Sequence, residues 1–345
     1  MFKKLSIENF RGFNKFSIDG LSDINIFTGA NGCGKTSVLE AVFLLSSQSR
    51  TLPININSLH QFRTKNTYLI GFFSPSPFEY LFKDITKPIV INSEDTTLEI
   101  KPITSEFSQF STTASPTLTG IDIFLNGEHQ GKYSWHNNII KDELSGKEIT
   151  NEITNDFQNI LVTTFISPYF CNIEGFYITL LSNMIKNGKR NEILKLFQMF
   201  HPEIKDFTSL SDRGTQTIFV DIGTGRYIPI SLLGTGFLNF IDTILPVFAL
   251  KNSIILIDEI EDGVYYLYVP KLLKTIFEIA RENNNQLFIT THSKELLLSI
   301  VSVIQDLNKE DSISFFNINF AENVDVDRYS IEDVKNLMEI NLDIR

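Results

Sequence analysis

The sequence predicts an α/β fold in which a mixed sheet is joined by an antiparallel β subdomain and a helical lobe. Three observations predict this class. A glycine-rich phosphate-binding motif at residues 29–36 lies between a buried strand and a helix. Over residues 86–136 apolar positions alternate, which is typical of antiparallel strands with one buried face. Over residues 216–345 apolar strands alternate with helices, which indicates a mostly parallel sheet covered on both faces.

The composition is that of a globular protein, because 42% of the 345 residues are hydrophobic and 21% are charged. The net charge of −11 argues against non-specific nucleic-acid binding as the main activity. Two cysteines, Cys33 and Cys171, argue against a disulfide framework and fit a reducing cytosol. The N-terminus leads into an alternating strand, and no apolar run approaches the length of a membrane span. We therefore expect a cytoplasmic protein without membrane association.

The first 50 residues, 1–50, are expected to form the P-loop lobe. Alternating apolar residues predict a strand over 2–10 and a short second one over 16–18. Residues 24–27 are expected to be a buried strand that enters the motif, and residues 35–46 the helix that leaves it. The motif therefore has the strand–loop–helix context that a phosphate-binding loop requires.

The middle of the chain is expected to contain the antiparallel β subdomain. Within it, the pair at 126–127, Asn-Gly, is a hairpin signal. Residues 104–119 are rich in serine and threonine and are expected to be a loop, as is the polar stretch 137–158. Residues 160–166 are expected to return to a buried strand.

A helical insert is expected over residues 169–215, with two helices within 176–200. Three neighbouring apolar residues, Phe197, Met199 and Phe200, lie near the end of the second helix. They have two interpretations: a surface on which a partner docks, or ordinary core packing.

The last lobe, residues 216–345, is expected to contain the remaining functional segments. Two short strands lead into the glycine-bearing segment 231–236. The elements after it are expected in alternation: helix 237–250, strand 253–257, helix 265–282, strand 286–291, helix 294–306, strand 313–320 and helix 331–340. The Asp-x-Asp pattern at 325–327 is expected to lie in a solvated acidic turn.

The phosphate-binding motif reads Gly29, Ala30, Asn31, Gly32, Cys33, Gly34, Lys35 and Thr36. Its glycines let the backbone curl so that successive N–H groups face one anion. Lys35 is expected to contact the β- and γ-phosphates of ATP, and the Thr36 hydroxyl to ligate Mg²⁺. Ser37 completes the expected binding segment, and the helix that starts here directs its positive dipole end toward the phosphates.

Two further strands are expected to end in catalytic side chains. The apolar run 254–257 is followed by Asp258 and Glu259, at the strand end where parallel sheets bind ligands. Asp258 is expected to hold Mg²⁺, and Glu259 to orient and polarise the attacking water. The next apolar strand, 287–291, is followed by His292, which is expected to sense the γ-phosphate. The alternatives, a helix cap for the carboxylates and a structural histidine, are weaker because the P-loop is present.

The order of these motifs resembles that of ABC-type ATPases: P-loop, glycine-bearing signature, Asp-Glu strand, Thr-His-Ser switch. The opening segment 5–13 (Leu-Ser-Ile-Glu-Asn-Phe-Arg-Gly-Phe) is similar to the RecF, SMC and OLD-like branch. Residues 257–263 (Ile-Asp-Glu-Ile-Glu-Asp-Gly) and 339–345 resemble compact OLD-like AAA ATPases of bacterial anti-phage systems. The ATPase subunits of PARIS-type and retron-associated systems are the relatives that this resemblance indicates.

The resemblance implies a single ABC-type ATPase domain over 1–345, in a homodimer or higher oligomer of ATPase heads. It makes Arg11 a candidate nucleotide contact and 262–263 (Asp-Gly) the loop that crosses the dimer interface. The signature that it implies, facing the γ-phosphate of a second subunit, is Gly234, Thr235 and Gly236. Leu233 replaces the serine expected in ABC proteins, so a hydroxyl donor is lost and we expect slow hydrolysis.

Three functions are compatible with the sequence. The first is an ATP-dependent switch that controls a separate effector, such as a nuclease or toxin, in anti-phage defence. The second is a RecF-like DNA-repair ATPase that binds nucleic acid in its ATP state. The third, a transporter energy subunit, is disfavoured by the opening segment and by the missing serine.

Overall fold

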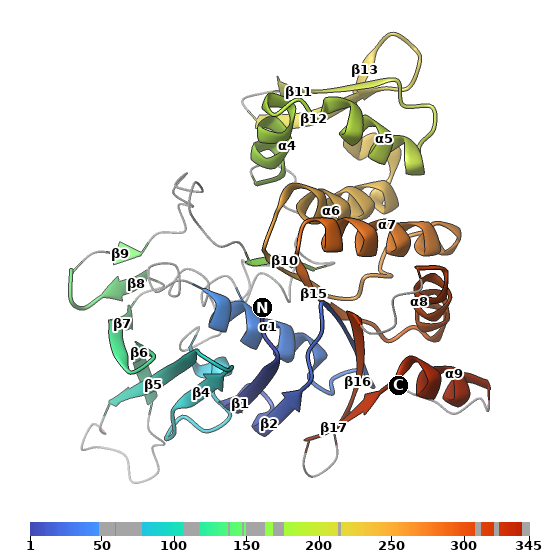
Figure 1. Cartoon of the computed structure of the whole chain (residues 1–345). Coiled ribbons are helices and arrows are strands. Elements are labelled where there is room, and N and C mark those ends of the chain that lie inside the picture. Colours follow the sequence, from blue (N-terminus) through green and yellow to red (C-terminus); the bar gives the residue numbers. More distant parts are fainter. Residues whose placement is uncertain are drawn as a thin grey trace.

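The computed structural model describes residues 1–47, 59, 78–105, 117–136, 139–146, 148–149, 163–167, 176–212, 215–307, 312–320 and 324–339. In this part of the chain there are three sheets and seven longer helices, and α1 (Lys35–Ser46) lies apart from the other helices, on the opposite face of the central sheet (Figure 1). None of the helices in these ranges is long and apolar enough to cross a membrane.

A six-stranded sheet forms the centre of the molecule, with strand order β10-β14-β15-β3-β16-β17. All neighbouring pairs are parallel except β16 with β17. The strands are β3 (Ile24–Thr28), β10 (Thr163–Ile166), β14 (Ile254–Ile257), β15 (Gln286–Thr290), β16 (Ile313–Phe320) and β17 (Val324–Tyr329). The predicted parallel sheet is confirmed.

The sheet is covered on both faces because consecutive strand residues point to opposite sides. One face packs against α1 (Lys35–Ser46) and an antiparallel sheet, through aromatic side chains that include Phe27, Phe288 and Phe316. The Phe27 ring stacks on Phe288 and Phe316 at centroid distances of 6.2 and 5.3 Å. The other face packs against α6 (Thr235–Ala249), α7 (Val269–Glu282) and α8 (Lys294–Leu307).

The antiparallel sheet has eight strands in the order β2-β1-β4-β5-β6-β7-β8-β9. They are β1 (Lys4–Phe10), β2 (Phe13–Asp19), β4 (Ile89–Asn92), β5 (Thr97–Ser105), β6 (Thr117–Leu125), β7 (Glu128–His136), β8 (Ile139–Asp142) and β9 (Glu148–Ile149). Asn126 and Gly127 both have positive φ, 51° and 79°, as the predicted hairpin turn requires. The sheet extends beyond the predicted subdomain, because β8 and β9 lie in the stretch 137–158 that we expected to be a polar loop.

A short 3₁₀ turn, η1 (Glu79–Leu81), precedes β4. The predicted helices of the insert are confirmed as α4 (Phe176–Lys186) and α5 (Arg190–Phe200). They pack with a three-stranded antiparallel sheet of β11 (Asp206–Asp212), β12 (Thr215–Asp221) and β13 (Tyr227–Pro229) (Figure 1). The residues of β11 are mostly polar and did not predict a strand. The expected insert boundary at 215 therefore divides the hairpin of β11 and β12.

The partner-docking interpretation of the α5 end is wrong for Phe197, whose side chain is fully buried. Its ring contacts Phe207 and Phe237 at centroid distances of 5.1 and 5.9 Å. Phe200 stacks on Tyr268 at 4.5 Å, and Met199 packs against the same cluster. The core interpretation is therefore confirmed for Phe197, while Met199 and Phe200 are half-buried at the edge of the same cluster.

The C-terminal elements end with β17 and α9 (Ile331–Glu339), which packs beside α8. The prediction of an acidic turn at 325–327 is wrong, because these residues lie within β17 and pair with β16. Asp325 and Asp327 point to solvent while Val326 is half-buried, so the acidic side chains occupy the exposed face of an edge strand.

Candidate nucleotide site

The P-loop joins the end of β3 to the start of α1 and has the backbone shape that its glycines permit. Gly29, Gly32 and Gly34 have φ values of 139°, 80° and 106°. A Cβ on Gly34 would also lie 2.5 Å from the Phe13 ring, so glycine is needed there for space as well as for conformation. Among the described residues no side chain caps the α1 N-terminus, and its first turn contains no acid. The N–H groups and the positive helix end can therefore bind an anion.

Lys35 places a positive charge inside this loop. Its side chain is 7% exposed, and Nζ donates hydrogen bonds to the carbonyl oxygens of Gly29 at 2.7 Å and Ala30 at 3.1 Å. An ammonium group has three donors, so one remains to bind a phosphate oxygen. The rest of the predicted segment consists of exposed residues, Asn31 and Gly32, and of buried ones, Cys33 and Ser37.

Thr36 and Asp258 meet although they are far apart in the sequence. Thr36 Oγ1 lies 2.9 Å from Asp258 Oδ2 and 3.1 Å from Oδ1. In an octahedral Mg²⁺ site with metal–oxygen distances of about 2.1 Å, two adjacent ligand oxygens lie roughly 3 Å apart. A hydroxyl and a carboxylate at this separation fit a magnesium ion, which takes oxygen ligands.

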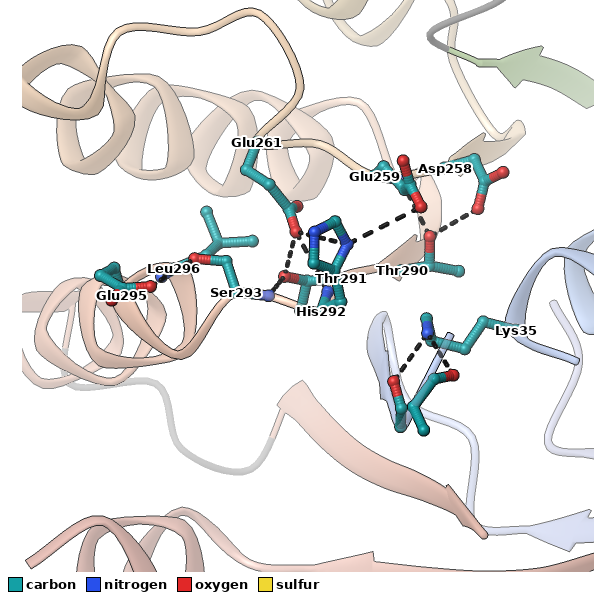
Figure 2. A network of polar contacts seen from close by, with 12 residues as sticks. Lys35, Asp258, Glu259, Glu261, Thr290, Thr291, His292, Ser293, Glu295 and Leu296 are labelled. Atoms are coloured by element: carbon teal, nitrogen blue, oxygen red, sulfur yellow. Dashed lines mark hydrogen bonds and ion pairs between the residues drawn. The ribbon is translucent and has the colours of Figure 1, made fainter. Parts of the chain in front are cut away.

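Asp258 and Glu259 follow β14, and a residue of the neighbouring strand β15 makes hydrogen bonds to both (Figure 2). The parallel register aligns Ile257 with Ile289, which brings Thr290 beside the two acids. Thr290 Oγ1 donates to Asp258 Oδ1 at 2.6 Å and accepts the Glu259 backbone N–H at 2.9 Å. Glu259 adopts a φ of 50°, so this hydrogen bond fixes a sparsely populated backbone conformation. Thr290 was not identified from the sequence, although its place at the end of the adjacent parallel strand is a usable signal.

His292 lies between two carboxylates at the same edge of the sheet. Its Nδ1 atom is 3.7 Å from Glu259 Oε1 and 3.5 Å from Glu261 Oε1. Figure 2 shows the imidazole between the Glu261 and Glu259 side chains. The structure thus brings the predicted residues Asp258, Glu259 and His292 together.

The pKa of Glu259 is raised above its usual value, mainly because the carboxyl is partly buried. The charge of Asp258 raises it next, and that of Glu261 adds to the effect. His292 and Lys35 act in the opposite direction. A carboxylate with a raised pKa is a better proton acceptor near neutral pH than an ordinary one.

Glu259→Gln is expected to leave the nucleotide-free fold at least as stable as the wild type at neutral pH. The folded-state pKa lies above the unfolded one, so the stability that protonation provides is complete below the unfolded pKa and is lost as the pH rises through the folded one. The glutamine amide does not ionise, so the variant does not lose this stability at neutral pH. We expect its melting temperature to be higher by no more than about 3 °C. Thermal melts from pH 4.5 to 8 measure it, and the difference should shrink toward acid pH. A neutral-pH melting temperature clearly below that of the wild type would contradict the prediction.

The predicted signature lies at the start of α6, after the 3₁₀ turn η3 (Ile230–Leu233). Gly234 has a φ of 97°, and it and Thr235 are exposed. Gly236 is packed, because a Cβ there would lie 2.6 Å from the Gly263 carbonyl oxygen. The signature and the loop 262–263, whose Asp262 carbonyl accepts a hydrogen bond from α6, therefore form one continuous surface.

Arg11 binds within its own chain. Its guanidinium makes two hydrogen bonds to the fully buried Glu40 of α1, at 3.0 and 3.1 Å. It also donates to the Tyr80 carbonyl oxygen at 3.1 Å. This pairing joins the β1–β2 turn to the P-loop helix, and a contact between Arg11 and nucleotide stays a prediction. Glu40 interrupts an apolar helix, which is the signal that would have pointed to a buried partner.

This fold, with its P-loop, its acidic strand end, its histidine and an α6 N-terminus that no described side chain caps, defines an ABC-type ATPase head. The chain belongs to the family described as "AAA domain, putative AbiEii toxin, Type IV TA system", whose model matches residues 24–299.

The chain is also similar to several known proteins. An "ATP/GTP phosphatase" of Helicobacter pylori is 25% identical over 98% of this chain and 100% of its own length. The "DNA replication and repair protein RecF" of Acinetobacter baylyi is 52% identical, over 13% of this chain and 12% of its own length. The crystal structure of an SMC head bound to the C-terminal winged-helix domain of ScpA shares the fold, with a TM-score of 0.52, 12% identity and coverage of 97% and 99% of the two chains.

Proposed function

We propose that the protein is a cytoplasmic, ATP-dependent switch whose heads close in pairs on ATP and separate after hydrolysis. One observation carries the proposal: a continuous hydrogen-bonded chain joins Thr36 of the P-loop through Asp258 and Thr290 to Glu259. The groups that would hold the phosphates and Mg²⁺ are thus fixed relative to the group that would activate water.

Each side chain has a defined part in the proposed reaction. Lys35 binds the β- and γ-phosphates with its remaining N–H donor. Thr36 and Asp258 hold Mg²⁺, which neutralises phosphate charge when it is bound. Glu259 orients the attacking water and accepts its proton, and His292 beside it contacts the γ-phosphate.

The α6 N-terminus supplies the second half of the site in the proposed dimer. Among the described residues no side chain caps this helix, and Gly234 and Thr235 are exposed at its start. Their N–H groups and the helix dipole favour a γ-phosphate held by the other subunit. Leu233, in place of a serine, contributes no hydroxyl donor, so turnover is slow and the closed state lasts long.

The proposed output is control of a separate effector, a nuclease or toxin, in bacterial anti-phage defence. The family description names a toxin of a toxin–antitoxin system, and the OLD-like pattern of residues 257–263 supports the same setting. A second candidate, a RecF-like ATPase that binds DNA when ATP is bound, is supported by the short RecF matches. ATP-dependent binding of labelled duplex DNA at physiological salt would favour this second function.

Thr235→Glu in a Glu259→Gln background is expected to abolish ATP-dependent dimer formation while ATP still binds. A carboxylate in the first turn of α6 favours that helix within its own chain. Facing the phosphates of a second subunit, however, one extra negative charge costs about 1–4 kcal/mol. Light scattering with and without ATP and Mg²⁺ measures the mass. The Glu259→Gln protein alone should gain mass with ATP, because it binds ATP without destroying it.

Thr235→Gln is the control for Thr235→Glu, since it has nearly the same shape without the charge and should still associate. Gly236 is unsuitable for this test because any side chain there meets the Gly263 carbonyl. Equal masses of the Glu259→Gln protein with and without ATP would argue against ATP-driven closure. If the Thr235→Glu double variant associates as well as Glu259→Gln alone, the signature does not lie in the dimer interface.

A further inference from the structure

One carboxylate oxygen fixes the turn that contains His292. Glu261 lies in the loop after β14, with its side chain 16% exposed. Its Oε1 atom accepts hydrogen bonds from the Thr291 hydroxyl at 2.7 Å and from the His292 backbone N–H at 3.0 Å. Both donors belong to the turn between β15 and α8. Glu261 therefore joins the loop that follows Glu259 to the turn that positions the imidazole (Figure 2).

The same oxygen also faces the ring of His292. Nδ1 is 3.5 Å from Glu261 Oε1, and 3.7 Å from Glu259 Oε1 on the other side. The second oxygen of Glu261, Oε2, is buried and has no hydrogen-bond partner among the residues that the structure describes. The two hydrogen bonds and the contact with the ring are therefore all made by Oε1.

We propose that Glu261 is a positioning residue for hydrolysis, which holds the Thr291–His292 turn so that the imidazole stays beside Glu259. The proposal rests on the function proposed above. Among the described residues, no hydrogen bond or ion pair joins the Glu261 side chain to residues 29–36. Glu261 therefore acts on the rate of the chemical step through His292, and ATP binding does not depend on it.

A purely structural role makes a different prediction from a positioning role. A brace that only stabilises the fold changes the melting temperature, and its loss adds to the loss of His292. A residue that acts through His292 has no further effect once the imidazole is gone, so the two substitutions are non-additive. Glu261→Gln keeps an oxygen that accepts the two hydrogen bonds but removes the charge that faces the ring.

The test measures ATP turnover, KM and calorimetric ATP affinity for Glu261→Ala, Glu261→Gln, His292→Ala and the Glu261→Ala/His292→Ala double variant. Glu261→Ala is expected to lower kcat tenfold or more, with KM and Kd within twofold of the wild type. Glu261→Gln should recover part of that loss. In the His292→Ala background, Glu261→Ala should change kcat less than twofold. Glu278→Gln, at an exposed carboxylate of α7, removes the same charge and should match the wild type.

Full additivity in the double variant would overturn the proposal, and so would an effect confined to Kd and melting temperature. If Glu261→Ala fails to fold, Thr291 provides the test, because Thr291→Val removes the hydroxyl donor and Thr291→Ser restores it. A lower kcat in the valine variant that serine rescues supports the proposal, and equal rates in both overturn it. A wild-type protein that does not hydrolyse ATP would refute the proposed function itself, which is a separate outcome.

Discussion

Glu259→Gln is expected to lower the rate of ATP hydrolysis at least a hundredfold while ATP affinity stays within a fewfold of the wild type. The amide keeps the shape of the side chain, and the backbone N–H can still donate to Thr290. What is lost is the charge that accepts a proton from water, and general-base catalysis of this kind contributes about 10²- to 10⁴-fold. Phosphate release at saturating ATP and Mg²⁺ measures the rate, and calorimetry measures the affinity.

The Glu278→Gln protein is the matched control for Glu259→Gln as well, because it removes a carboxylate of the same kind from the surface. A Glu259→Gln rate above one tenth of the wild-type rate would show that another group activates the water. Asp258, held by Thr36 and Thr290, would then be the first residue to test.

Lys35→Ala is expected to weaken ATP binding at least tenfold. The substitution removes the ammonium that the P-loop surrounds, and a charge-assisted hydrogen bond of this type contributes about 1.5–3 kcal/mol. Lys35→Met should lose nearly as much, since it keeps the apolar stem that is buried here but not the charge. Calorimetry of both variants with ATP and Mg²⁺ provides the measurement.

Because Lys35 is 7% exposed and binds its own loop, thermal melts must accompany the affinity measurement. Weakened ATP binding in a variant that melts within a few degrees of the wild type supports the P-loop assignment. Unchanged affinity in the methionine variant would show that the charge of Lys35 does not bind phosphate.

The central sheet could be predicted because its strands are buried on both faces and therefore read as unbroken apolar runs. The strands that were missed have little apolar sequence of their own. Among the β11 residues whose burial the structure describes, only Phe207 is fully buried, and β17 exposes Asp325 and Asp327. Such strands form because a neighbour offers a hydrogen-bonding edge, and a single sequence does not show which edges are free.

In the candidate site, too, some residues could be predicted from the sequence and others could not. Asp258, Glu259 and His292 could be predicted, since each follows an apolar strand and parallel strands end at one edge. Thr290 and Glu261 could not, because their hydrogen bonds depend on how adjacent strands and loops are aligned. Local pattern therefore predicts which side chains lie at this edge of the sheet, and only the tertiary register shows which groups hold them in place.

The position of α1 between the two larger sheets links nucleotide binding to the cooperativity of the whole head. Ten of its residues are buried, and the seven apolar ones belong to the core that the central and antiparallel sheets share. The P-loop helix cannot fray without separating these sheets, so the nucleotide stabilises the global native state rather than a local flap. A ligand at 100 times its Kd adds about 2.7 kcal/mol to global stability by mass action. ATP depletion would therefore lower resistance to proteolysis throughout the part of the head that packs around these two sheets.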